Sequence, residues 1–148
     1  GANGSGKSTL LTWMGRRSAP TEDSVGGLTV SGSVFWIPQH LPKLGDPGVD
    51  ENVWTEGIGD RGRGSLHPCL WNRPISELSD GNQRRVQLAL AAAAGPEVLV
   101  VDEPTNYLDL DALEMLEAAV RTWTGTLIVA SHDRWLIEHW WGRRLHLR

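Results

Sequence analysis

The sequence has 148 residues, of which 40% are hydrophobic and 22% are charged, values typical of one soluble globular domain with a hydrophobic core. The net charge of −4 gives no electrostatic reason to expect nucleic-acid binding, and the single cysteine excludes an internal disulfide, as in proteins of a reducing compartment. Basic pairs such as Arg84-Arg85 are predicted to lie on solvated faces. No apolar run is long enough to cross a bilayer and no signal peptide is visible, so we expect a cytoplasmic protein without direct membrane insertion.

The chain begins with a glycine-rich loop that predicts a phosphate-binding site. Residues 1–9 fit the P-loop pattern G-x-x-x-x-G-K-[ST]. Glycines let backbone N–H groups point at phosphate oxygens, Lys7 adds a positive charge, and the Ser8 hydroxyl suits Mg²⁺. A Gly/Ser turn before an ordinary helix is the alternative, but the complete motif opens a predicted helix, Lys7 to about Arg17. The candidate nucleotide-binding residues are Gly1, Asn3, Gly4, Ser5, Gly6, Lys7, Ser8 and Thr9.

A P-loop joins a strand to a helix, yet no strand precedes Gly1 in this sequence. We therefore expect a single domain over residues 1–148 that lacks its N-terminal strand and is part of a longer protein.

Two short strands follow the first helix. Thr21–Gly27 is polar and glycine-rich and is predicted as a loop. Leu28–Val30 and Val34–Ile37 are predicted as strands of a small β-subdomain. Gln39 comes directly after the second strand, near the sheet edge at which open α/β proteins bind ligands.

Proline and glycine interrupt the next part of the chain. A short helix is predicted near Val49–Gly57, and Gly57–Arg73 is predicted as an irregular, mobile insertion. His67 and Cys69 are close together in it. A metal site is not expected without a second pair of ligands, and a reactive Cys69 is not expected without a base beside it.

A capped helix and a buried strand carry the next candidate residues. Ser79 is a plausible N-cap of an alanine-rich helix that stops at Gly95. The apolar run Val98–Val101 then predicts a central strand of a parallel sheet, and it ends in two carboxylates. Asp102 suits Mg²⁺, and Glu103 could orient or deprotonate a water molecule, although a strand end that merely meets solvent is the alternative.

The last third of the sequence predicts a helix, a strand, a helix and a short strand. An amphipathic helix begins at Asp109 and ends at Gly125, and Thr126–Ala130 is predicted as another buried strand. A helix to about Trp141 and a short strand, Arg144–Leu147, follow.

His132 lies just after the strand that ends at Ala130. It should therefore lie near the same sheet edge as Gln39 and Glu103. A lone histidine is usually structural, but three polar groups at one edge favour a catalytic role for Gln39, Glu103 and His132.

Six motifs in this order resemble those of the ATP-binding cassette (ABC) ATPases, over nearly the whole chain. They are the Walker A loop at Gly4, Gly6, Lys7 and Ser8, the Q-loop at Gln39, the signature at 78–82, Walker B with the catalytic glutamate at Asp102 and Glu103, the D-loop at 106–109, and the switch histidine at His132. The sequences of residues 103–109 and 131–135 are similar to those of the ABC-F group, whose soluble twin-cassette proteins act on ribosomes and include antibiotic-resistance factors.

The resemblance implies an α/β P-loop ATPase with a mostly parallel sheet flanked by helices, a small β-subdomain and a reduced helical insertion. It implies ATP and Mg²⁺ as cofactors, and it implies that Ser8, Gln39 and Asp102 are the metal-binding residues. Glu103 would polarise water and His132 would position it. A second cassette, in cis or as a dimer, is the implied partner, and Ser79 and Gly81 would contact the γ-phosphate held by that partner.

Three functions remain open on the sequence. The first is an ABC-F factor with the ribosome as partner, the second is the motor of a membrane transporter with a transmembrane subunit, and the third is a degenerate module that does not hydrolyse ATP. The signature has Asp80 where glycine is usual and Asn82 where glutamine is usual. Because a carboxylate repels phosphate, and because a lone cassette holds half-sites, we expect Mg²⁺-dependent ATP hydrolysis that is weak in this chain alone.

Overall fold

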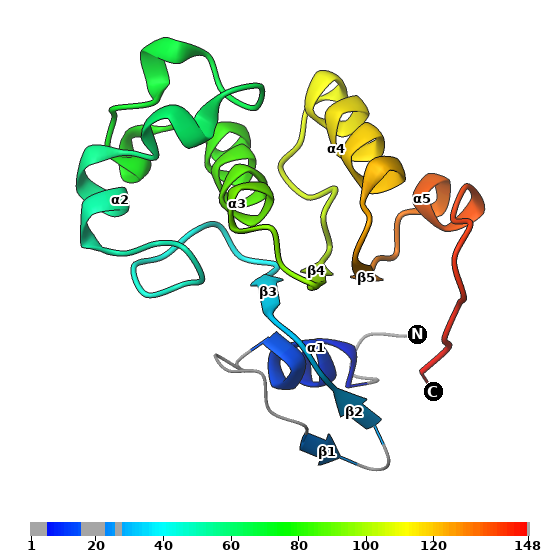
Figure 1. The fold of residues 1–148 in the computed structure, drawn as a ribbon. Coiled ribbons are helices and arrows are strands. Elements are labelled where there is room, and N and C mark those ends of the chain that lie inside the picture. The colour runs from blue at the N-terminus through cyan, green and yellow to red at the C-terminus, as the bar shows by residue number, and fades with distance from the viewer. Residues whose placement is uncertain (1–5, 16–22, 26–27, 148) are drawn as a thin grey trace.

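The computed structural model describes residues 6–15, 23–25 and 28–147. Its centre is a parallel three-stranded sheet in the order β3 (Val34–Ile37), β4 (Val98–Asp102) and β5 (Thr126–Ala130). Helix α1 (Lys7–Gly15) lies on one side of this sheet, and α3 (Asp80–Ala94) and α4 (Leu110–Thr122) lie on the other (Figure 1). The α/β class and the parallel sheet flanked by helices confirm the fold predicted from the sequence.

The central strand β4 is apolar throughout because both of its faces are covered. All five of its residues are buried. Alternate side chains of a strand point to opposite faces, so Leu99 and Val101 pack in the core beneath α3, while Val98 and Val100 pack against α1. The edge strand β5 is only half-buried, whereas the sequence predicted a fully buried strand.

The α1 side of the sheet holds the smaller of the two cores. Leu11 and Met14 are the buried residues of α1. At its end, a side chain on Gly15 would clash with Trp36, because a Cβ would lie 2.3 Å from Trp36 Cβ. The helix was predicted to reach Arg17, and residues 16 and 17 lie outside the described part of the chain.

The other side of the sheet is covered by α3 and by the segment between Gln39 and Ser79. That segment forms α2 (Glu51–Glu56) and three 3₁₀ turns, at Gly59–Gly62, Pro68–Leu70 and Ile75–Glu77. The predicted insertion contains neither α-helix nor strand, as expected, but it is packed, since Ile58 and Leu66 are buried in the core.

One prediction about this insertion is wrong. Cys69 was expected to have no base beside it, yet His67 Nδ1 lies 3.0 Å from Cys69 Sγ. The two residues are near neighbours because the His67 ring caps the 3₁₀ turn, accepting from the Cys69 N–H.

The small β-subdomain differs from the prediction. Residues Asp23–Val25 form β1, which pairs antiparallel with β2 (Leu28–Val30), so the predicted loop is wrong at these three residues. Residues 21, 22, 26 and 27 of that loop lie outside the described part of the chain. Strand β3 pairs with β4 instead of β2 and so belongs to the parallel sheet. Ser33 and Glu97 fix this pairing, since the Ser33 N–H donates to Glu97 Oε2 at 2.7 Å and the Glu97 N–H donates to Ser33 Oγ at 3.0 Å.

The C-terminal region has less regular structure than predicted. Helix α4 ends at Thr122, and α5 (Arg134–Glu138) ends before the predicted Trp141. Residues 144–147, predicted as a strand, adopt no strand, and among the described residues no strand lies paired with them. No helix within the described ranges is long and apolar enough to span a bilayer.

Candidate functional site

The described part of the glycine-rich loop leads directly into α1. Gly6 has φ +81°, in the left-handed region that favours glycine, and its carbonyl accepts from the Leu10 N–H at 2.9 Å. Lys7 and Ser8 form the first turn of the helix, and Ser8 and Thr9 are exposed. The predicted contributions of Gly1, Asn3, Gly4 and Ser5 lie outside the described residues.

Asp102 lies where β4 ends, beside this helical turn. It is only 4% exposed, and burial raises its pKa, while a hydrogen bond from the Ser8 side chain and the charge of Lys7 act in the opposite direction. A carboxylate and a hydroxyl are the hard oxygen ligands that Mg²⁺ prefers. Among the described residues, no group of three or more His, Cys, Asp or Glu side chains is arranged to hold a metal ion by itself.

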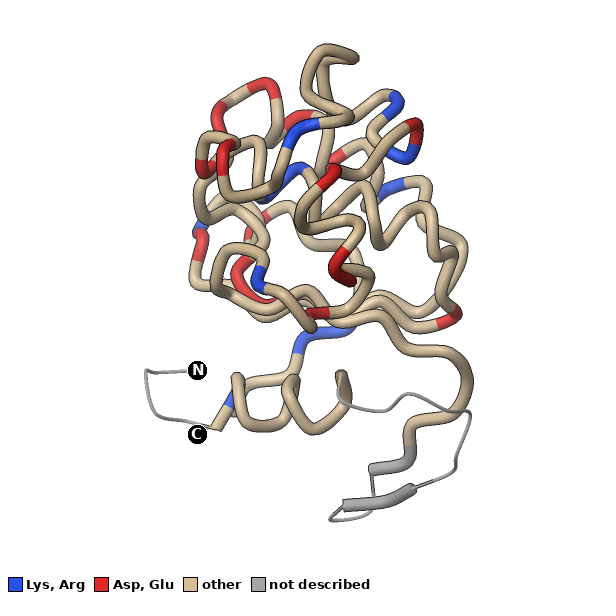
Figure 2. The backbone as a smooth tube through the Cα atoms, turned by 90° about the vertical axis from the view of Figure 1, so that its left-hand side faces the viewer, with Lys and Arg blue, Asp and Glu red and all other residues tan. Residues whose placement is uncertain are grey.

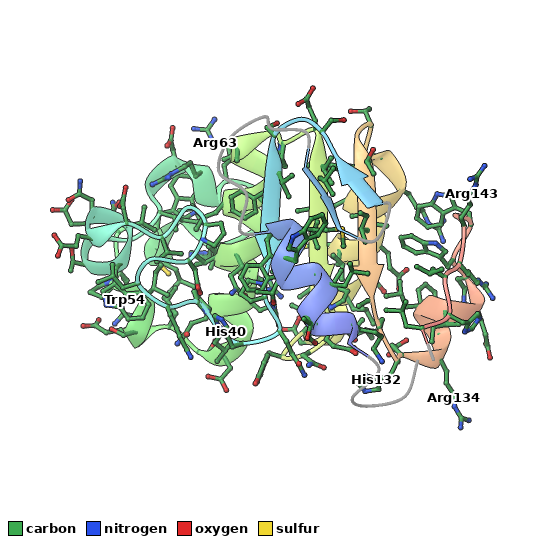
Figure 3. The ribbon with its side chains drawn as sticks, turned by 90° about the horizontal axis from the view of Figure 1, so that it is seen from below. His40, Trp54, Arg63, His132, Arg134 and Arg143 are labelled. Carbon is green, nitrogen blue, oxygen red and sulfur yellow. The ribbon has the colours of Figure 1, made fainter. Side chains whose placement is uncertain are left out.

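Glu103 and His132 form a direct pair at the same edge. His132 Nδ1 lies 2.8 Å from Glu103 Oε1, and the His132 N–H donates to Glu103 Oε2 at 3.3 Å. The Glu103 side chain is 8% exposed and that of His132 is 77% exposed. Figure 3 shows His132 next to the end of α1 at which the glycine-rich loop enters, in agreement with the effect of the Lys7 charge on its pKa. The pair can therefore reach a molecule bound to that loop.

The backbone at Glu103 has an uncommon conformation. Its φ is +50°, in the left-handed region, and its N–H donates to the Ala130 carbonyl at 2.8 Å, which continues the β4–β5 pairing by one residue. A residue other than glycine in this region is uncommon and costs energy, and such strain occurs often at functional sites.

The hydrogen bond that Glu103 accepts from the His132 ring is the main cause of the raised pKa of His132. A raised pKa means that the folded state favours the imidazolium, so this pair stabilises the fold below the ordinary pKa of 6.5, and the contribution is lost as the pH rises through the raised pKa. We expect Glu103→Gln to lower the pKa of His132, measured by following the His132 ring protons in a pH titration by NMR. The other histidines serve as internal controls, and an unchanged His132 titration would contradict the observed pairing.

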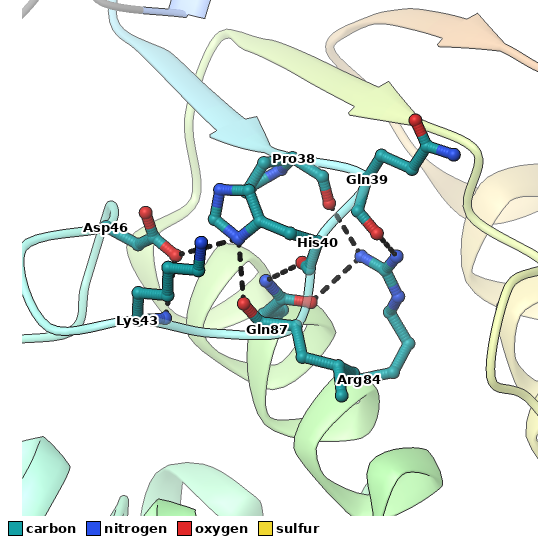
Figure 4. Close-up of polar contacts among 8 residues, drawn as sticks. Pro38, Gln39, His40, Lys43, Asp46, Arg84 and Gln87 are labelled. Atoms are coloured by element: carbon teal, nitrogen blue, oxygen red, sulfur yellow. Dashed lines mark hydrogen bonds and ion pairs between the residues drawn. The ribbon is translucent and has the colours of Figure 1, made fainter.

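Gln39 is held next to the site by a hydrogen bond of its backbone. Its carbonyl accepts from Arg84 at 2.7 Å, and its side chain is exposed and directed away from Arg84 (Figure 4). Among the described residues no hydrogen bond joins the Gln39 amide to Asp102 or Glu103. The structure therefore brings Lys7, Ser8, Asp102, Glu103 and His132 together, and it places Gln39 at the adjacent strand end without a side-chain contact to them.

The signature residues lie at the start of α3, on the opposite side of the sheet from α1 (Figure 1). Ser79 is the N-cap of α3, as predicted, and its hydroxyl accepts from the Asn82 N–H at 3.4 Å. Gly81 lies close to the turn that contains Tyr107, since a Cβ on Gly81 would lie 3.1 Å from the Tyr107 carbonyl oxygen. Ser79 and Gly81 thus do not belong to the cluster around Asp102.

Sequence reasoning missed Arg84. It was predicted to lie on a solvated face, but it is fully buried, and burial lowers the pKa of its guanidinium to about 10. Its neighbour Arg85 pairs with the exposed Asp109 at 2.9 Å. A signal was present in the helical spacing, because Arg84 lies three residues before Gln87 and seven before Ala91, both buried, and therefore shares their face.

Figure 2 shows acidic and basic residues spread over the described backbone, and α3, α4 and α5 each carry both signs.

Comparison with known proteins identifies the protein family that this chain matches. The family profile described as ABC transporter matches residues 1–106. The chain is 33% identical over 158 residues to ABC transporter F family member 2 of Arabidopsis thaliana, covering 100% of this chain and 23% of that protein. It is 32% identical over 148 residues to the ribosome protection protein VmlR of Bacillus subtilis, covering 93% and 26%. It is 34% identical over 156 residues to the energy-dependent translational throttle protein EttA of Haemophilus influenzae, covering 93% and 27%. The chain spans about a quarter of the length of these relatives.

The fold also matches a solved cassette. The structure described as a dimeric post-hydrolysis state of the ATP-binding cassette MJ0796 bound to ADP and Pi has a TM-score of 0.60 to this chain, with 23% identity over 89% of this chain and 72% of that one. At this identity the match shows the fold alone.

Proposed function

Because this chain belongs to the ABC transporter family of ATP-binding cassettes and resembles its F group, we propose that it binds ATP with Mg²⁺ and hydrolyses ATP as one cassette of a ribosome-acting protein. The observation that carries the proposal is the cluster at the end of β4, in which Asp102 is bonded to Ser8 and Glu103 is bonded to His132. The groups that we propose to bind phosphate, to bind Mg²⁺ and to activate water thus lie close together at this end of β4.

Each residue of the cluster has a role that follows from its position. The N–H groups that open α1 and the Lys7 ammonium would hold the phosphates. Ser8 and Asp102 would hold Mg²⁺, which neutralises phosphate charge when bound. The buried Glu103 carboxylate would accept a hydrogen bond from the attacking water, and the exposed His132 would place that water beside the γ-phosphate.

We propose that the complete site needs a second cassette. Ser79 and Gly81 lie apart from the Asp102 cluster, at the far side of the sheet, so they suit a nucleotide held by a partner. The solved cassette with the same fold is dimeric. Gln39 would approach the metal only after its exposed side chain turns toward Asp102.

The ribosome as partner is supported by the relatives. The VmlR protein is described as a ribosome protection protein, and the EttA protein as a translational throttle. We propose that the full-length protein acts on the ribosome in its ATP-bound state.

Sedimentation of the full-length protein tests this proposal. Glu103→Gln should slow hydrolysis and keep ATP bound, so this variant should co-sediment with purified ribosomes in the presence of ATP and Mg²⁺ but not with ADP. Adding Lys7→Ala should remove the effect, because the P-loop then loses its phosphate-binding ammonium. Absence of ATP binding by calorimetry would overturn the cassette assignment, whereas ATP binding without co-sedimentation, or recovery with membranes, would overturn only the ribosomal role.

A further inference from the structure

A fully buried arginine joins two loops that flank the candidate metal site. Arg84 extends from α3 toward the loop after β3, where Nη1 donates to the Pro38 carbonyl at 2.8 Å and Nη2 donates to the Gln39 carbonyl at 2.7 Å (Figure 4). Nη1 also donates to Gln87 Oε1 at 2.9 Å. On the other side, Nε donates to the Asn106 carbonyl at 3.4 Å. The rigid guanidinium therefore connects the segment that carries Gln39 with the turn that follows Asp102 and Glu103.

Gln87 extends this connection by one residue. Its Nε2 donates to the His40 carbonyl at 3.1 Å while its Oε1 accepts from Arg84. Two side chains of α3 thus hold three consecutive carbonyls, those of Pro38, Gln39 and His40. The backbone of this segment is thus held at three consecutive carbonyls, while the Gln39 side chain is exposed.

The turn at Asn106 and Tyr107 also contacts α3 through Arg84. The Tyr107 ring lies 5.8 Å from the Arg84 guanidinium carbon, within the range of a cation–π contact. Tyr107 has φ +68°, a conformation that a non-glycine residue adopts only when its surroundings hold it. The negative charge of Asp102 also acts on Arg84.

Stability alone does not account for a charge at this position. Among the described residues no carboxylate lies within ion-pair distance of Arg84. The cost of burying its charge is offset by three backbone carbonyls, by Gln87, by the Tyr107 ring and by the more distant Asp102. A buried charge costs desolvation free energy that an apolar side chain of similar volume would not. What the guanidinium adds is geometry, because its planar fork fixes several acceptors at once.

We infer that Arg84 is a positioning residue, which sets the placement of Gln39 relative to Asp102 and thereby the affinity of the site for Mg²⁺·ATP. This inference rests on the proposed function. Lysine keeps the charge but its single ammonium cannot hold Pro38, Gln39 and Asn106 in the same arrangement.

The test compares Arg84→Lys with Arg85→Lys, a matched change one residue away whose side chain pairs with the exposed Asp109. Calorimetry on the full-length protein measures ATP affinity with and without Mg²⁺. Arg84→Lys should reduce by about tenfold the factor by which Mg²⁺ tightens ATP binding, and should leave Mg²⁺-free binding through Lys7 unchanged. Arg85→Lys should match the unchanged chain in both conditions.

The outcomes separate the inference from the function on which it rests. Failure of the unchanged full-length protein to bind ATP would remove the proposed function itself. An unaltered Mg²⁺ effect in Arg84→Lys, or an equal loss with and without Mg²⁺, would show a purely structural role and overturn the inference. If Arg84→Lys does not fold by circular dichroism, Gln87→Met serves instead. It removes one partner of Arg84 and the bond to His40, and it should produce a smaller change in the same direction.

Discussion

Glu103→Gln is expected to reduce ATP turnover by about 10²–10⁴-fold while ATP binding is retained. The carboxylate is 8% exposed and bonded to His132, so it is placed to take charge from an attacking water, which a neutral amide cannot do. The proposed phosphate contact of Lys7 and the hydrogen bond between Ser8 and Asp102 do not involve it. Steady-state phosphate release from the full-length protein gives the turnover, and calorimetry gives the affinity for ATP.

Glu114→Gln is the matched control, since Glu114 is exposed on α4 and contributes nothing to the site. It should hydrolyse ATP at the unchanged rate. Turnover by Glu103→Gln within a few-fold of that control would exclude Glu103 as the group that activates water, and the same would follow if both affinity and turnover fell together.

Ile37→Ala is expected to lower the free energy of unfolding by about 2–5 kcal/mol. Ile37 is fully buried at the end of β3 and belongs to the larger core, so removing its methyl and methylene groups leaves a cavity. Urea unfolding followed by tryptophan fluorescence measures the change, and the denaturant slope should remain constant.

Leu110→Ala provides the comparison, because Leu110 is 71% exposed at the start of α4. Its effect should be within about 0.5 kcal/mol of zero. Equal effects of the two substitutions would show that the β3–β4 face does not form the main core of the chain.

The elements that could be predicted from the sequence are those with a strong local signal. The apolar run at Val98–Val101 needs both faces covered, and its two terminal carboxylates then lie at a ligand-binding edge. The same reasoning placed His132 next to Glu103, which the 2.8 Å pair confirms. The N-cap at Ser79 was equally readable, since its hydroxyl accepts from the Asn82 N–H at the start of α3.

The features that sequence reasoning missed depend on partners far along the chain. Arg84 is buried because carbonyls more than twenty residues away surround it. Its helical spacing from Gln87 and Ala91 indicates the buried face of α3, but nothing in the neighbouring sequence identifies the carbonyls that cover it. Residues 144–147 have the composition of a strand, but a strand exists only where a neighbour offers hydrogen bonds, and the described residues provide none. Asp23–Val25 is too short and polar to be recognised as a strand without its partner β2.

The sheet divides the interior into two hydrophobic cores of unequal size. Among the described residues, five are buried in the cluster beneath α1 and fourteen in the cluster beneath α3. A region with fewer buried contacts opens at a lower free energy than the molecule as a whole, so α1 should detach from the sheet more readily than α3 does. A ligand that binds Gly6–Thr9 only in the docked arrangement shifts this opening equilibrium by RT ln(1 + [L]/Kd). Under the proposed function, the nucleotide concentration would therefore set how much of the time α1 remains docked, and ATP would act as a folding ligand for its own binding site.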